Sequence, residues 1–273
     1  AYTALFWAIG VQPLHTAFRV SGSSLLTLGF AVADGTPATI LMFSEAGIGL
    51  TLVALLIAYL PTMYSNFSRR ESAVTLLEVR AGSPPTAWEL IQRFSLLQRL
   101  ELLIDLWTEW EQWFVEVDET HTSIGALPFF RSPQPDRSWI TAAGAVLDAA
   151  SFAASTLDLP PDPRASLCIR AGMVALRHIA EFFGVQYNAD PHYPDDPISV
   201  SRAEWEAAYE QMRRAGVPLR ADRDQAWSDW AGWRVNYDRV LIQLCTLVMA
   251  PSAPWSGDRA TTYTAPPLLT RRR

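Results

Sequence analysis

A long apolar run constrains this chain more than any other feature of its sequence. Residues 37–60 contain a single charged residue, Glu45. A helix of about 24 residues would be about 36 Å long, which is enough to cross the hydrocarbon core of a bilayer with some tilt. We therefore expect a membrane-spanning helix here, and we expect Pro61 to kink or end it near Tyr64.

A shorter apolar segment precedes this helix. Residues 13–26 are too few to span a membrane as a helix, and they are followed by the Gly-containing stretch Thr27-Leu28-Gly29-Phe30-Ala31. A half-length helix, an irregular turn and a full-length helix are typical of a re-entrant loop. Non-helical backbone at membrane depth is tolerated only where it is buried in protein or lines a water-filled cavity. Its carbonyl groups can then replace the hydration shell of a cation.

These residues resemble a known family. The stretch 27–31 (TLGFA) is similar to the Thr-Val-Gly-Tyr-Gly filter of the potassium-channel pore-loop superfamily. Residues 43–50 (FSEAGIGL) and 55–60 (LLIAYL) resemble the inner helix of bacterial two-transmembrane and two-pore-type channels, and the resemblance covers residues 13–65. It implies a channel for potassium or another monovalent cation, built as a homo-oligomer with its filters around one axis. The ion would be bound by Thr27, Leu28, Gly29, Phe30 and Ala31, mainly through carbonyl oxygens and the Thr27 hydroxyl.

The chain departs from the family pattern at two places. Ala31 stands where the family has its second filter glycine, and Asp34 lies three residues further on, whereas the family has an acid directly after the glycine. A left-handed conformation costs an L-residue about 1–2 kcal/mol. The inner ion sites near Thr27 and Gly29 are therefore expected to be stronger than the outer sites. As a consequence, we expect a weaker preference for potassium over sodium than a channel with the Thr-Val-Gly-Tyr-Gly filter has.

Three residues of the long helix have two interpretations each. A charge at the depth of Glu45 is usually paired or functional, so we expect either a pair with Arg19 or a role in permeation. Gly47 and Gly49 lie in mid-helix, where they indicate either a gating hinge or close packing of helices.

The residues around this module predict its topology. Arg69 and Arg70 directly follow the long helix. By the positive-inside rule we expect the rest of the chain to lie in the cytoplasm. The expected location of the long helix is the inner membrane of the cell. The apolar residues 1–11 could be the last turns of an outer helix truncated at its N-terminus. All basic residues are arginine, which is typical of a GC-rich bacterial genome.

The remainder predicts an all-α protein with three parts: a pore-loop module (1–67), a cytoplasmic helical domain (68–250) and a disordered tail (251–273). Helices are expected over 71–81, 86–118, from 138, over 164–183, from 201 to 216, and over 222–249. Capping boxes formed by Thr86 with Glu89 and by Ser201 with Glu204 open two of them. Tryptophans that recur every three residues on two of the helices indicate core packing, with an exposed aromatic stripe as the alternative.

Composition and spacing argue against several functions. The net charge of -6 and the lack of a basic face exclude nucleic acid as an expected partner. Neither His121 with its acidic neighbours nor the loop with Asp190, His192, Asp195 and Asp196 has the spacing of a metal site, and we expect His121 at the surface. Cys168 and Cys245 are expected to be buried thiols. No phosphate loop or nucleophile motif is present, so we expect no enzyme, metal or cofactor. The alternative to a channel is a non-conducting, membrane-anchored helical domain that binds a partner or small ligand.

Overall fold

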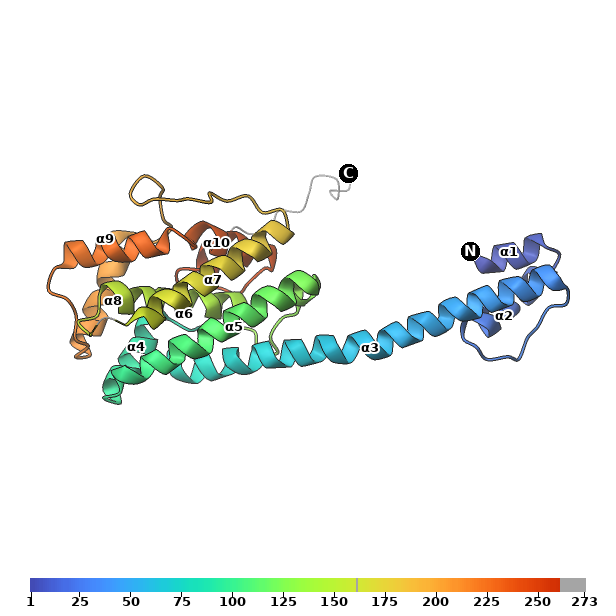
Figure 1. Ribbon diagram of the computed structural model, residues 1–273, viewed down its shortest axis with the longest axis horizontal. Helices are drawn as coiled ribbons and strands as arrows, with labels where there is room; N and C mark the ends of the chain where they lie inside the picture. Colours follow the sequence, from blue (N-terminus) through green and yellow to red (C-terminus); the bar gives the residue numbers. More distant parts are fainter. Residues whose placement is uncertain (161, 261–273) are drawn as a thin grey trace, which may run out of the picture. The chain divides into compact units, whose positions relative to one another are not determined.

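The computed structural model describes residues 1–160 and 162–260, and its regular structure in these ranges is helical (Figure 1). The described exception is an isolated antiparallel bridge between Leu157 and Leu219. This confirms the all-α prediction for the described residues. The chain divides between Ser65 and Asn66 into two compact units.

The first unit contains α1 (Tyr2–Ala8), α2 (Leu14–Leu25) and the beginning of α3 (Thr36–Ala81). Pro13 is the N-cap of α2 and has extended backbone, so the helix begins at Leu14. A small core of Phe6, Ala17 and Val20 joins α1 to α2.

Helix α3 is longer than the sequence predicts, because it continues through Pro61 to Ala81 without ending. The expected stop near Tyr64 and the separate helix over 71–81 are therefore wrong. A proline removes one hydrogen bond from a helix, and in long apolar helices the bonds on either side maintain the structure. By length and composition α3 is the one candidate membrane span in the described chain; its most apolar window has a mean hydropathy of 2.2 and is 11% buried.

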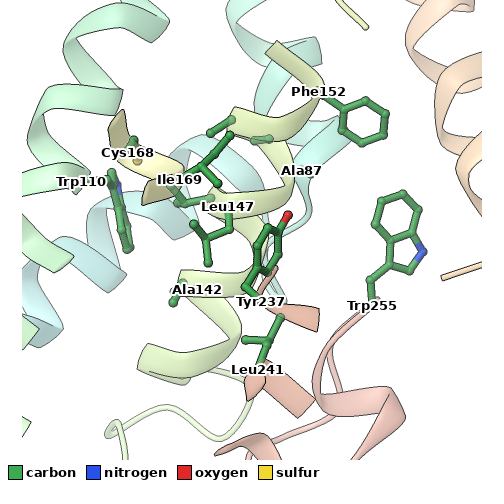
Figure 2. Packing of buried hydrophobic residues seen from close by; sticks show 14 of the residues in the cluster. Ala87, Trp110, Ala142, Leu147, Phe152, Cys168, Ile169, Tyr237, Leu241 and Trp255 are labelled. Carbon is green, nitrogen blue, oxygen red and sulfur yellow. The ribbon is translucent and has the colours of Figure 1, made fainter. Parts of the chain in front are cut away.

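The second unit is a helical domain built around α6 (Trp139–Ser155), in which nearly every side chain is buried. The other helices are α4 (Ala87–Leu96), α5 (Leu103–Ser123), α7 (Pro163–Phe182), α8 (Arg202–Arg214), α9 (Arg223–Arg234) and α10 (Asp238–Leu247), with short 3-10 turns at Leu100–Leu102, Leu127–Phe129 and Gly257–Arg259. Figure 2 shows side chains from several of these helices meeting around Leu147 of α6. The tryptophans of α5 and α9 contribute to this core, as predicted: Trp110 and Trp230 are almost fully buried.

Two predicted long helices are each interrupted once. The prediction over 86–118 fails at Gln98, whose φ of 55° ends α4. Arg99 N–H donates to Phe94 O across this turn, a Schellman-type end that usually employs glycine. The prediction over 222–249 fails between α9 and α10, where Tyr237 turns inward and donates its hydroxyl to Asp148 at 2.8 Å. Non-local bonding outweighs the helical periodicity there.

Of the two predicted capping boxes, one forms completely and the other forms only one of its two hydrogen bonds. Ser201 and Glu204 form the complete reciprocal box at the start of α8. At α4 the Thr86 hydroxyl accepts a bond from Glu89 N–H, but the Glu89 carboxylate pairs with Arg93 instead of returning to the cap.

The predicted disordered tail begins at residue 251, but the structure describes residues 251–260 as packed against the helical domain. Trp255 is 5% exposed and packs against Trp88, Phe152 and Trp230, and Arg259 pairs with Glu204. Residues 261–273, where the rest of the predicted tail falls, lie outside the described residues.

A buried ionic cluster fastens this segment to the core. Arg234, which is 0% exposed, donates to Asp148 at 2.6 and 2.8 Å, to Asp238 at 2.6 Å and to the carbonyl of Trp255 at 2.7 Å. Burial raises the pKa of Asp148, and the nearby Arg234 cation opposes that shift. One guanidinium thus connects α6, α9, α10 and the chain that follows them.

Arg70 and His121 form a second buried polar contact in the same unit. His121 is 0% exposed, so the prediction of a surface histidine is wrong. The Arg70 guanidinium lies 3.3 Å from His121 Nε2 and donates to the carbonyls of Leu127 and Phe130 at 3.0 and 2.6 Å. Burial, with a smaller contribution from the Arg70 charge, lowers the pKa of His121 to about 3. The imidazole is therefore neutral and accepts a bond from Arg70.

Candidate functional site

The predicted ion-binding residues lie in the segment that joins α2 to α3. The two helices run in the same direction, since Ser21 contacts Glu45 and Leu25, four residues later, contacts Gly49. The 12-residue helix α2 is about 18 Å long. A connection between helices of the same direction must return over that length, which about ten extended residues can do.

The course of the segment agrees with this geometry. Ala31 N–H donates to the Ser23 hydroxyl at 3.1 Å, close to the end of α2. Further along, Val32 and Asp34 line a pocket of about 310 Å³ with Gln12 and Thr16, at the beginning of α2. Residues 27–34 therefore run back along α2, antiparallel to it.

The backbone of this loop adopts left-handed conformations at alternate residues. Thr27 has a φ of 52° and Gly29 a φ of 70°. For a β-branched residue such as Thr27 this conformation costs about 1–2 kcal/mol. Leu28 N–H donates to Ser23 O at 2.8 Å, and the side chains of Leu28 and Phe30 are both exposed. Thr27 N–H also donates to Ser24 O at 3.0 Å, so Thr27 is the left-handed residue of a Schellman-type end of α2, a position that glycine usually occupies.

Ala31 differs from its expected geometry. It is absent from the residues with positive φ, so it does not carry the left-handed strain that the family pattern would place there. Its N–H is instead bound to Ser23. The backbone is left-handed at Thr27 and Gly29, and this alternation does not continue to Ala31.

Glu45 is held by a serine and not by Arg19, so the predicted ion pair is wrong. Its side chain is 2% exposed, and Oε1 accepts a 2.6 Å hydrogen bond from the Ser21 hydroxyl. Its other oxygen, Oε2, is buried without a hydrogen-bond partner among the described residues. The Arg19 guanidinium lies 5.7 Å from the centre of the Phe30 ring, a cation–π distance.

The two glycines of α3 have different surroundings. A Cβ built on Gly49 would lie 1.8 Å from the carbonyl oxygen of Leu25, whereas one on Gly47 would meet nothing within 4 Å. Gly49 therefore permits the close packing of α3 on the end of α2, which is one of the two roles expected of it. No described residue packs against Gly47.

Sequence reasoning missed the serines that support the loop. Ser21, Ser23 and Ser24 are all buried on α2. Their clustering at 21–24 was visible in the sequence, and three hydroxyls on one short apolar helix indicate polar partners that the helix itself does not supply.

Other candidate sites supply little chemistry. Among residues 1–160 and 162–260, no group of three or more His, Cys, Asp or Glu side chains could hold a metal ion. Burial raises the pKa of the Cys168 and Cys245 thiols, which are free as predicted and unreactive. In the acidic loop that follows α7, the Asp196 carboxylate accepts hydrogen bonds from the His192 N–H and from the Asn188 side-chain amide.

Comparisons of the chain with protein-family models, with curated proteins and with solved structures find no match.

Proposed function

We propose that this chain is a subunit of a cation channel in which residues 27–31 line the ion pathway. The observation that supports this most directly is the return of the loop along α2 with left-handed backbone at Thr27 and Gly29. In the channel family that this loop resembles, unusual backbone conformations also alternate along the filter, and its carbonyl groups line one side. A row of carbonyl oxygens on one side is what a dehydrated cation requires.

The remaining features of the first unit agree with a membrane location. Apolar side chains of α3 such as Phe43, Leu56 and Ile57 are exposed in the isolated chain, which is favourable against lipid and costly in water. A re-entrant segment is tolerated at that depth because Ser23 of α2 binds its backbone: the Ser23 hydroxyl accepts from Ala31 N–H, and the Ser23 carbonyl accepts from Leu28 N–H. The other side of the loop then faces the ion.

One loop can form only one wall of a pathway. Several identical subunits around an axis would surround the ion with carbonyl oxygens, so the proposal includes a homo-oligomer. Potassium or another monovalent cation is the proposed substrate, and Arg69 and Arg70 favour a cytoplasmic location for the second unit, with the chain in an inner membrane.

The test is cation flux through the purified full-length chain in potassium-loaded liposomes. We expect flux from the parent chain and its loss in Gly29→Ala. At φ 70° a side chain is strained although no atom lies within 4 Å of the new Cβ, so this variant acts through the backbone alone. Gly232→Ala is the matched control, because it adds the same methyl group to an open helical position in α9, outside the first unit.

Absence of flux from the correctly inserted parent chain, or unchanged flux in Gly29→Ala, would refute the channel. The alternative, a non-conducting membrane-anchored domain that binds a partner or small ligand, predicts no flux from any of the three proteins.

A further inference from the structure

The second unit contains an apolar pocket that the proposed ion pathway does not use. The pocket has a volume of about 640 Å³ and lies among the beginning of α5, the end of α6 and the beginning of α7. Leu103, Trp107 and Ala165 on its wall are almost fully buried. Its volume is in the range of pockets that enclose a small organic molecule, and such pockets are mostly apolar with a few fixed polar groups.

The charged side chains at the rim of the pocket differ in how strongly they interact with other residues of the chain. The Asp162 carboxylate accepts two side-chain bonds from Arg164 at 2.9 and 2.7 Å and a third from the Arg164 N–H. Glu101 has Arg99 at 3.4 Å. Both acids of the rim therefore have an arginine of their own beside them, which leaves Arg220 as the rim cation to consider.

Arg220 combines a fixed backbone with a loosely held side chain. Its N–H donates to Thr156 O at 2.9 Å, and its carbonyl accepts from the Tyr209 hydroxyl at 2.8 Å. Among the residues that the structure describes, its guanidinium has a 3.9 Å approach to Asp229 and a 3.4 Å bond to Ala154 O. A guanidinium presents five N–H donors in a planar fork that fits an acid group. Most of those donors remain available here.

From this geometry we propose that the pocket binds an amphipathic organic acid, with its apolar body among Leu103, Trp107 and Ala165 and its acid group on Arg220. The apolar wall supplies affinity through burial of hydrocarbon. The arginine supplies orientation, since an acid group placed deeper would lose its hydration without a cation to replace it. This inference does not depend on whether the first unit conducts ions.

The experiment is photolabelling of the full-length chain in lipid nanodiscs with a ten-carbon carboxylic acid that carries a diazirine. The matched probe is the primary alcohol of the same chain and diazirine. We expect saturable labelling by the acid of peptides that line the pocket. Arg220→Gln should weaken labelling by the acid about tenfold or more, as expected for loss of a charge-assisted bond, and should leave labelling by the alcohol unchanged.

Two further variants complete the test. Arg213→Gln removes an exposed arginine that pairs with Glu210 outside the pocket, and it should change neither labelling. Ala154→Phe should reduce labelling by both probes because it fills the pocket, with circular dichroism as the check on folding. Labelling confined to other peptides, or equal labelling by acid and alcohol that Arg220→Gln leaves unaltered, would overturn the proposal without bearing on ion flux.

Discussion

The Ser21 hydroxyl donates a 2.6 Å hydrogen bond to Glu45 Oε1, and this bond joins the short helix α2 to the long helix α3. Both residues are buried, and four residues further along each helix Leu25 O meets Gly49. A polar bond and a backbone contact one turn apart thus fix α2 on α3. Because the loop 27–31 is bonded to α2 through Ser23, these two contacts also fix the loop.

Removal of the Ser21 hydroxyl is expected to destabilise the first unit. In Ser21→Ala both oxygens of the Glu45 carboxyl would be buried without a partner, at a cost of about 1–3 kcal/mol. Thermal unfolding of the purified chain in detergent measures the loss. Thr51→Ala is the control, since Thr51 is exposed on α3, the helix that carries Glu45, and its hydroxyl donates only to Gly47 O of that helix. Equal melting temperatures for Ser21→Ala and the parent chain would contradict the role given to this bond.

Gly49→Ala is expected to displace α2 and to abolish or greatly reduce ion flux. The new methyl group would lie 1.8 Å from Leu25 O, a backbone atom that cannot move without the helix. Gly47→Ala should leave flux intact and slightly stabilise α3, by about 0.5–1 kcal/mol. Flux in liposomes and the melting temperature distinguish the two variants. If both behave alike, the close approach at Gly49 does not determine the position of the loop.

Replacement of Arg234 is expected to unfold much of the second unit. Arg234→Met would leave Asp148 and Asp238 buried without their cation, and breaking such a pair costs about 3–5 kcal/mol. Chemical denaturation followed by tryptophan fluorescence reports this loss. Arg239→Met removes an exposed arginine of the neighbouring helix and should change stability little. A small effect of Arg234→Met would mean that the carboxylates become protonated or hydrated at low cost.

His121 is expected to make the second unit less stable as the pH falls. In the folded chain its pKa is about 3, against 6.5 for the free side chain. Between these values the unfolded chain binds a proton that the folded chain does not, so stability falls with decreasing pH by at most about 1.4 kcal/mol per unit. Denaturant midpoints between pH 4.5 and pH 7.5 measure the slope.

The variants for this pH test are His121→Gln and His192→Gln. Gln at position 121 keeps an acceptor for Arg70 but does not titrate in this range, so the slope should become shallower. His192 lies on the exposed loop after α7, and its replacement should leave the slope as it is. A slope that persists unchanged in His121→Gln would assign the pH dependence to other groups.

What the sequence determined by itself was local. The apolar run of residues 37–60 specifies a long helix because nearly every side chain is a hydrophobe, Pro13 specifies the beginning of α2, and Ser201 with Glu204 specifies the beginning of α8. In each case the residues that cause the structure lie within a few positions of it. The short helix, glycine-containing loop and long helix were predicted for the same reason.

The tertiary structure decided which distant groups meet. Glu45 is bonded to Ser21 and not to Arg19, Arg70 and His121 are buried together, and α9 is separated from α10 where Tyr237 turns toward Asp148. Helical periodicity cannot predict these outcomes, because the free energy of a buried polar group depends on the partner that the fold brings to it. Removing such a group from water costs several kcal/mol unless a partner is present, and that cost outweighs the few tenths of a kcal/mol by which most residues differ in helix propensity.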